Sequence, residues 1–183
     1  MKHFEKLIEK HFSSTIKLSP LIDFKIFQVN ERYFELPKKN QWIIDGGIEL
    51  QFPSAVFCLG WSLDYDSFIF KNKKFEEIYT ENNFIELNGG NINKLKKMIK
   101  NTIVEAKYKW IDYDVILDYT MATKKESRLV ELIIKFKSND IVQFSIVDYH
   151  LEENSSPKNF SYDINGELLI ALNNNEIIKN NNT

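Results

Sequence analysis

The first stretch of the chain mixes apolar and charged residues at helical spacing. Phe4, Leu7, Ile8 and Phe12 recur every three or four residues, and glutamate and lysine fill the positions between them. This period places the apolar side chains on one face of a helix. We therefore predict an amphipathic helix over 2–13 whose apolar face packs on the rest of the protein.

Much of the remaining chain has the two-residue period of β-strands, in which neighbouring side chains point to opposite faces. Turn-forming residues separate these runs. The predicted strands span residues 24–29, 33–36, 48–52, 55–63, 115–120, 130–136, 141–149 and 168–172. The short connections between several of them favour antiparallel hairpins and, toward the C-terminus, a meander.

The hairpin over 48–63 has a second strand with two unlike faces. Phe57, Leu59 and Trp61 share one face, while Cys58 and Gly60 lie on the other. Large apolar side chains on one face indicate a core, and small ones on the opposite face allow another layer to approach closely.

A second helix is predicted over 91–106, where Leu95, Ile99 and Ile103 recur at helical spacing. The fold class is therefore α+β, mainly antiparallel sheet, either a meander or strongly curved, with an N-terminal helix and one central packing helix. We expect a single domain over 1–172, the usual size of one domain. The Asn-rich tail over 173–183 is expected to fray.

We expect one core in which the large side chains of both hairpins meet the second helix. Its strand residues are Phe52, Phe57, Leu59, Trp61, Leu132, Ile134 and Phe136, and its helix residues are Leu95, Ile99 and Ile103. Such a cluster buries enough aromatic surface to anchor the fold.

The amino-acid composition indicates the cellular compartment in which the protein is expected. Cys58 is the single cysteine, so no intrachain disulfide can form, which fits a reducing compartment. No apolar run approaches the ~20 residues that a membrane-spanning helix needs, and no signal-peptide pattern is present. We expect a cytoplasmic protein without a membrane partner.

The charge balance bears on nucleic-acid binding. A formal net charge of −2 gives no strong positive field for binding phosphates. Lysines gather between 91 and 110, near Tyr108 and Trp110, which could stack on bases. A solvated surface uses lysine in the same way, so we expect no nucleic-acid partner. The lysines are Lys94, Lys96, Lys97, Lys100, Lys107 and Lys109.

The sequence lacks the residue patterns that metal binding and nucleophilic catalysis usually require. His3 and His11 lie eight positions apart in the predicted helix, so about 12 Å of rise separates them, too far for one metal ion. His150 is most simply a surface residue at a strand end. Cys58 sits between two large apolar residues, which favours a buried, unreactive thiol. We predict no catalytic residue, no cofactor and no bound metal.

One polar motif recurs. Asp-Tyr-Asp occurs at 64–66 and at 112–114, and Asp-Tyr pairs occur at 118 and 148. Residues two apart on a strand share a face at roughly 6.5 Å, so two such carboxylates could bind a hard cation or divide acid and base roles. Asp is also favoured at strand ends for local reasons, and that explanation carries more weight. A small hydrolase is therefore the alternative function, beside a structural homo-oligomer.

Three segments carry a resemblance to known proteins. They are ELQFPSAVFCLGW at 49–61, LIIKFKSNDIVQFSI at 132–146 and GELLIAL at 166–172. The chain resembles small bacterial cytosolic proteins, some of which look like immunity proteins of polymorphic toxin systems. The resemblance implies a non-enzymatic protein that binds a toxin domain and blocks its active site. It assigns no role to an individual residue.

The C-terminal third supplies an acidic surface that fits such a role. Over 139–176, seven acidic residues stand against Lys158, which gives a local net charge of −6. Complementary charge speeds association with a basic partner, and aromatic side chains supply binding energy. We expect the partner-binding residues to be Asp148, Glu152, Glu153, Asp163 and Glu167.

Overall fold

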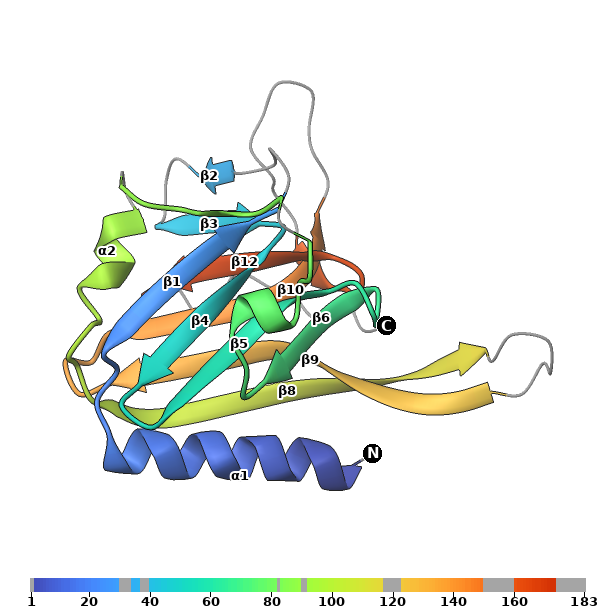
Figure 1. Cartoon of the computed structure of the whole chain (residues 1–183), viewed down its shortest axis with the longest axis horizontal. Helices are drawn as coiled ribbons and strands as arrows, with labels where there is room; N and C mark the ends of the chain where they lie inside the picture. The colour runs from blue at the N-terminus through green and yellow to red at the C-terminus, as the bar shows by residue number, and fades with distance from the viewer. Residues whose placement is uncertain are drawn as a thin grey trace.

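Two antiparallel β-sheets make up most of the molecule, as its computed structural model shows (Figure 1). The structure describes residues 2–29, 34–36, 40–81, 83–89, 92–116, 123–149 and 160–173. The helical elements are α1 (Lys2–Leu18), the 3₁₀ turn η1 (Phe75–Glu77) and α2 (Asn93–Lys96). The strands are β1 (Asp23–Gln28), β2 (Phe34–Leu36), β3 (Gln41–Ile44), β4 (Gly47–Phe52), β5 (Ala55–Ser62), β6 (Ser67–Lys71), β7 (Ile85–Glu86), β8 (Ile103–Ile116), β9 (Thr123–Phe136), β10 (Ile141–Tyr149), β11 (Phe160–Tyr162) and β12 (Glu167–Leu172). The predicted α+β class is confirmed.

The strands divide into a five-stranded and a seven-stranded sheet, called sheet A and sheet B. Sheet A has the order β6-β5-β4-β1-β7. Sheet B has the order β2-β3-β12-β10-β9-β8, with β11 paired to β10. The chain passes from sheet B to sheet A at Asp45 and Gly46, between β3 and β4. This crossing brings the ends of strands from both sheets together.

The main core lies between the two sheets. Phe24 of sheet A and Phe144 of sheet B meet with ring centres 6.0 Å apart. The predicted core is confirmed, because each of its residues belongs to this one cluster or packs against it. Trp61 and Ile99 are partly buried, and the other eight are buried.

α1 closes one side of the two-sheet body, where it runs alongside β8 (Figure 1). Phe12 is fully buried, and its ring meets Phe52, Phe57 and Phe70 edge-on at centre distances of 5.9, 4.9 and 5.5 Å. Each such contact adds about 0.5–1.5 kcal/mol to the gain from burial. The helix continues past residue 13, its predicted end, because Ile16 extends the buried stripe by another turn.

The outer face of sheet A is covered by η1, as the small residues of β5 predict. Phe75 lies against this face and stacks on Phe27 at a ring distance of 4.6 Å. A Cβ atom added to Gly60 would lie 2.9 Å from the Phe75 ring, so only glycine leaves room for it. Buried Glu49 accepts a hydrogen bond from the Phe75 backbone N–H and so fixes the start of η1.

The predicted helix over 91–106 is wrong in its second half. α2 ends at Lys96, and Lys100 adopts a left-handed backbone with φ of 67° before β8 begins at Ile103. Residues 103–110 also alternate apolar and charged side chains, and β8 pairs with β9 along its whole length. The long hairpin therefore outweighs the helical period, as tertiary pairing often does.

Other differences follow from burial and length. The sequence pattern does not predict β3 or β6, because nearly every residue of these strands is buried and no alternation remains. It also misses β7 and β11, which are very short. The strand expected over 115–120 is only the end of β8, and 117–120 lie outside the described residues.

Two predicted irregular segments fall mostly outside the described residues. The polar stretch over 152–161, with Ser155, Ser156 and Pro157, predicts an exposed loop. Of this stretch 152–159 are not described, and 160–161 pair with β10. Of the tail expected over 173–183, the structure describes Asn173, whose side chain accepts a hydrogen bond from the Ile141 N–H and donates one to Asp140.

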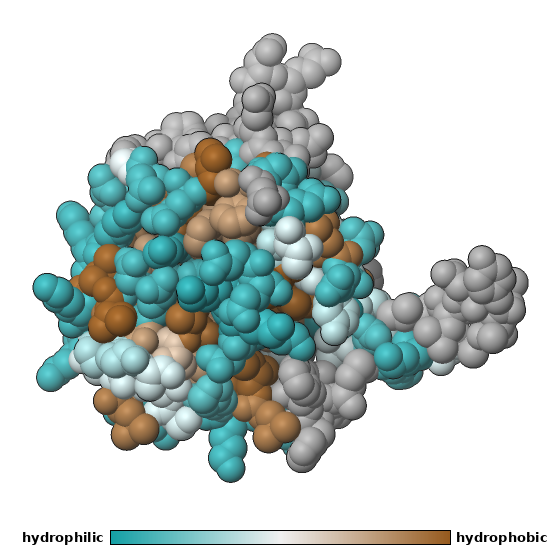
Figure 2. All heavy atoms as spheres, viewed as in Figure 1, coloured by the Kyte–Doolittle hydropathy of each residue, from teal (hydrophilic) through white to brown (hydrophobic). Residues whose placement is uncertain are grey.

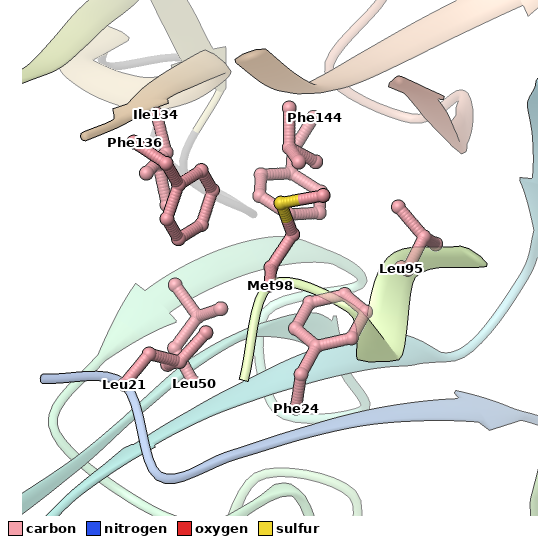
Figure 3. Close-up of a pocket in the computed structure, with 9 residues that line it drawn as sticks. Leu21, Phe24, Leu50, Leu95, Met98, Ile134, Phe136 and Phe144 are labelled. Carbon is pink, nitrogen blue, oxygen red and sulfur yellow. The ribbon is translucent and has the colours of Figure 1, made fainter. Parts of the chain in front are cut away.

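A small apolar cavity lies inside the body beside α2. Side chains from both sheets and Met98 converge on it, as Figure 3 shows. Its volume is about 10 Å³ and its lining has no polar surface. A space of this size holds at most one water and offers that water no hydrogen bond. The cavity is therefore a packing defect and not a binding site.

Truncation of Phe57 tests the core. This side chain is fully buried and touches Phe12, Phe52 and Phe70. Phe57→Ala is expected to lower the free energy of unfolding by about 3–5 kcal/mol, measured by chemical denaturation. Val104→Ala, at an exposed position, is the control and should change it by less than about 0.5 kcal/mol. Equal stability of the two variants would contradict this account of the core.

Candidate functional site

A cleft opens between the two sheets at the end where the chain crosses between them. Its volume is about 390 Å³, within the range of ligand and side-chain binding sites. Val29 and Trp61 lie where β1 and β5 end, and Phe68 lies near the start of β6. Asp45 comes from the crossing, and Glu167 opens β12. Both sheets therefore contribute to the cleft.

The described lining combines apolar and acidic side chains. Trp61 and Phe68 pack edge to face at 5.5 Å, and Leu63, which is 40% exposed, adds apolar surface. Asp45, Glu81 and Glu167 supply three carboxylates, and the described lining residues include no lysine, arginine or histidine. A cationic group that also carries apolar surface matches this lining.

Tyr79 fixes the outer wall of the cleft. Its hydroxyl lies 3.1 Å from Glu81 Oε2 and 2.8 Å from Asn83 Oδ1 and shares its one hydrogen between these two acceptors. Burial and the neighbouring Glu81 carboxylate raise the pKa of Tyr79 above its usual value. The hydroxyl therefore stays protonated at neutral pH and keeps Glu81 at the rim.

The predicted partner-binding residues are partly brought together. Glu167 lines the cleft and accepts a 2.8 Å hydrogen bond from the Tyr149 hydroxyl. Asp163 follows β11, and its carboxylate accepts a hydrogen bond from the N–H of Asn165, a lining residue. Asp148 is exposed on β10, opposite Ser161 of β11.

The remaining two of these residues, Glu152 and Glu153, lie outside the described residues. The three described ones share one end of sheet B, the end next to the cleft.

The sequence pattern does not single out Asp45, Glu81 or Asn83. Asp45 precedes Gly46 and Gly47 and is typical of a turn, while Glu81 and Asn83 lie in a polar stretch without periodicity. The crossing between the sheets places Asp45 at the same opening as Glu167, and the segment after η1 places Glu81 and Asn83 there. One feature of the sequence does indicate Asp45 as a candidate site residue. It directly follows the short apolar run 42–44.

The two Asp-Tyr-Asp motifs meet through their tyrosines. The Arg128 guanidinium lies 5.4 Å from the ring centres of both Tyr65 and Tyr113. The same guanidinium donates to Ser67 Oγ at 3.1 Å and forms a 2.8 Å ion pair with Glu126. This cluster, here called the Arg128 clamp, ties β9 to the turn between β5 and β6.

The carboxylates of these motifs have local partners or face solvent. Asp112 accepts a hydrogen bond from Ser127. Asp66 sits in the β5–β6 turn with a left-handed φ of 46°, a conformation that Asp tolerates. Across the described part of the chain, no group of three or more His, Cys, Asp or Glu side chains is arranged to hold a metal ion.

The single cysteine is fully buried on the outer face of sheet A. Burial, with a smaller effect of Glu49, raises the pKa of the Cys58 thiol well above its usual value. A high pKa leaves little thiolate, the form that attacks electrophiles and binds metals. This position is unlike that of a catalytic cysteine.

No described helix has both the length and the apolar character that a bilayer span requires. Comparison of the chain with protein-family models, with curated proteins and with solved structures finds no match. Its function is therefore inferred from the cleft and the surfaces beside it.

The Arg128 clamp can be tested by two substitutions. Arg128→Ala removes both ring contacts and the ion pair. The free energy of unfolding should therefore fall by about 1–2 kcal/mol, measured by chemical denaturation. Arg128→Lys keeps the charge but loses the planar group, so it should recover only part of this loss. Full recovery by lysine would show that the stacking between the tyrosines contributes nothing.

The thiol of Cys58 should be inert in the folded protein. A thiol-specific reagent at neutral pH is expected to label it only after unfolding in guanidinium chloride, because the folded protein hides the sulfur and suppresses the thiolate. The unfolded sample is the internal control. Rapid, stoichiometric labelling under native conditions would contradict the burial described above.

Proposed function

We propose that this chain is a non-enzymatic protein that binds a basic protein partner stoichiometrically through the acidic cleft. The observation that carries the proposal is the lining of the cleft, which joins three carboxylates to exposed apolar surface. The resemblance to immunity proteins points to a toxin domain as the class of partner, which the bound protein would neutralise by covering its active site.

Two physical effects support a binding role. Three carboxylates, from the crossing, the segment after η1 and β12, line one opening, and complementary charge raises the rate at which a basic partner arrives. Trp61 and Leu63 then offer apolar surface that gains free energy when a partner removes it from water. Charge thus raises the association rate, and apolar contact lowers the dissociation rate of the complex.

The acidic surface extends beyond the cleft. Asp148 and Asp163 lie at the same end of sheet B as Glu167, so negative charge continues along this end of the molecule. A small cationic ligand would contact only the carboxylates of the cleft. Because the acidic surface continues beyond the cleft, its extent matches a basic protein surface better than a small cation.

Neutralising substitutions test the proposal once a partner has been captured from the native host. Glu81→Gln with Glu167→Gln keeps hydrogen-bond acceptors for Tyr79 and Tyr149 but removes two charges. The association rate at low ionic strength should fall by about tenfold, since electrostatic steering contributes at least this much in charged complexes. Surface plasmon resonance at several salt concentrations measures this rate and its salt dependence, which should also become weaker.

The matched control removes the same number of negative charges at positions outside the cleft. Glu76 of η1 and Glu86 of β7 are exposed, neither lines the cleft, and each forms an ion pair with a lysine at 3.5 Å. Glu76→Gln with Glu86→Gln should leave the association rate nearly unchanged. If the control slows association as much as the cleft variant, net charge and not the cleft steers the partner, and the proposal fails.

A further inference from the structure

The hairpin of β8 and β9 extends past the two-sheet body as a two-stranded arm (Figure 1). The arm is defined as 111–116 of β8 with 123–128 of β9. β10 pairs with β9 only at 131–135, so no third strand of the described chain borders the arm. At about 3.3 Å per residue, its described strands are about 20 Å long. In Figure 2, hydrophilic residues lie where the arm leaves the body.

The base of the arm is held on both sides. Trp110 donates a 2.5 Å hydrogen bond to Glu9 of α1, and the Arg128 clamp ties β9 to the β5–β6 turn. The direction of the arm relative to the body is therefore fixed. An isolated pair of strands is only marginally stable in water, so a fixed, projecting ribbon gains stability when another strand pairs with it.

The two strands of the arm carry opposite charges. Asp112 and Asp114 are exposed on one face of β8, and neither forms an ion pair with another described residue. Lys124 and Lys125 are exposed on β9, where Lys124 forms a 3.0 Å ion pair with Glu126. The free edge of β8 is therefore acidic, while 123–128 of β9 carry a positive net charge.

This charge pattern disfavours pairing between two copies of the arm. Two copies related by a twofold axis normal to the ribbon could pair through their β8 edges. This arrangement brings the aspartates of both copies together. The other symmetric arrangement pairs β9 with β9 and brings together two segments of positive net charge, 123–128 of each copy. Like charges opposite one another across strands are destabilising. A second copy is therefore a poor occupant for either edge.

We propose that the free edge of β8 in the arm binds a basic β-strand of the partner protein as an added antiparallel strand. Backbone N–H and C=O groups of 111–116 would supply hydrogen bonds, and lysine or arginine at alternate positions would lie opposite Asp112 and Asp114. The inference rests on the proposed function for the choice of a basic partner. It adds the mode of binding and the sequence character of the strand.

The arm and the cleft adjoin the same turn, which allows one partner to touch both. Leu63 and Phe68 flank the β5–β6 turn on the side that lines the cleft. Tyr65 and Ser67 from the same turn hold Arg128 at the base of the arm. The cleft and the base of the arm thus adjoin the same turn.

A synthetic peptide of alternating lysine and valine, capped at both ends, probes the arm directly. It should bind the full chain in fluorescence anisotropy at low salt and slow amide exchange across 111–116. The same peptide with N-methyl groups at every second backbone nitrogen keeps its charge but cannot pair as a strand. Its affinity should be about tenfold lower or worse, because strand addition depends on backbone hydrogen bonds.

Variants of the chain assign the contact. Asp112→Asn with Asp114→Asn keeps an acceptor for Ser127 and should weaken peptide binding by about tenfold. Glu76→Gln with Glu86→Gln removes the same charge from elements outside the arm and should bind normally. Equal binding of the N-methylated peptide, unchanged binding to the Asp112/Asp114 variant, or exchange protection confined to other segments would each overturn the inference. Self-association through the arm in sedimentation, with no peptide binding, would overturn it as well.

Failure of this inference can be told apart from failure of the proposed function. A captured partner that responds to the Glu81/Glu167 variant but ignores the Asp112/Asp114 variant overturns the arm contact and leaves the cleft proposal in place. A partner that responds only to the Asp112/Asp114 variant overturns the cleft proposal and supports the arm.

Discussion

The burial of aromatic side chains between two sheets is the constraint on which the rest of this structure depends. Sheets A and B are held together by side chains such as Phe24 and Phe144, and by Phe12 of α1 at one side. Because the chain must cross between the sheets at Asp45 and Gly46, strand ends from both sheets meet there. The cleft is therefore a product of the same crossing that allows the core to form.

Much of the fold follows from the sequence where residue types alternate. The alternation of apolar Val142, Phe144 and Ile146 with polar Gln143 and Ser145 predicts β10 with its observed bounds, although both of its faces are buried. The large and small faces of β5 predict both the core and the covering layer. Prediction fails where no alternation remains, as in the short run Trp42–Ile44 of β3. It also fails at 103–106, where helical and strand periods coexist and only pairing with β9 decides between them.

The site is harder to predict because its residues are far apart in the sequence. Glu167 is expected from the charge of the C-terminal third, yet Asp45 reaches the same opening only through the crossing and Glu81 only through the segment after η1. Likewise, the repeated Asp-Tyr-Asp motif draws attention to its carboxylates, whereas the folded chain brings together its tyrosines at Arg128. Local sequence patterns predict which residues are polar, and the topology decides which of them meet.

On the proposed function, a partner protein binds at the acidic cleft. Hydrogen–deuterium exchange of the chain, alone and in complex with a captured partner, tests this most directly. Exchange should slow in the segments that contribute lining residues, at 45–47, 79–81 and 165–167, as their backbone is covered. Protection confined to the exposed side of α1, with unchanged exchange in all three cleft segments, would contradict it.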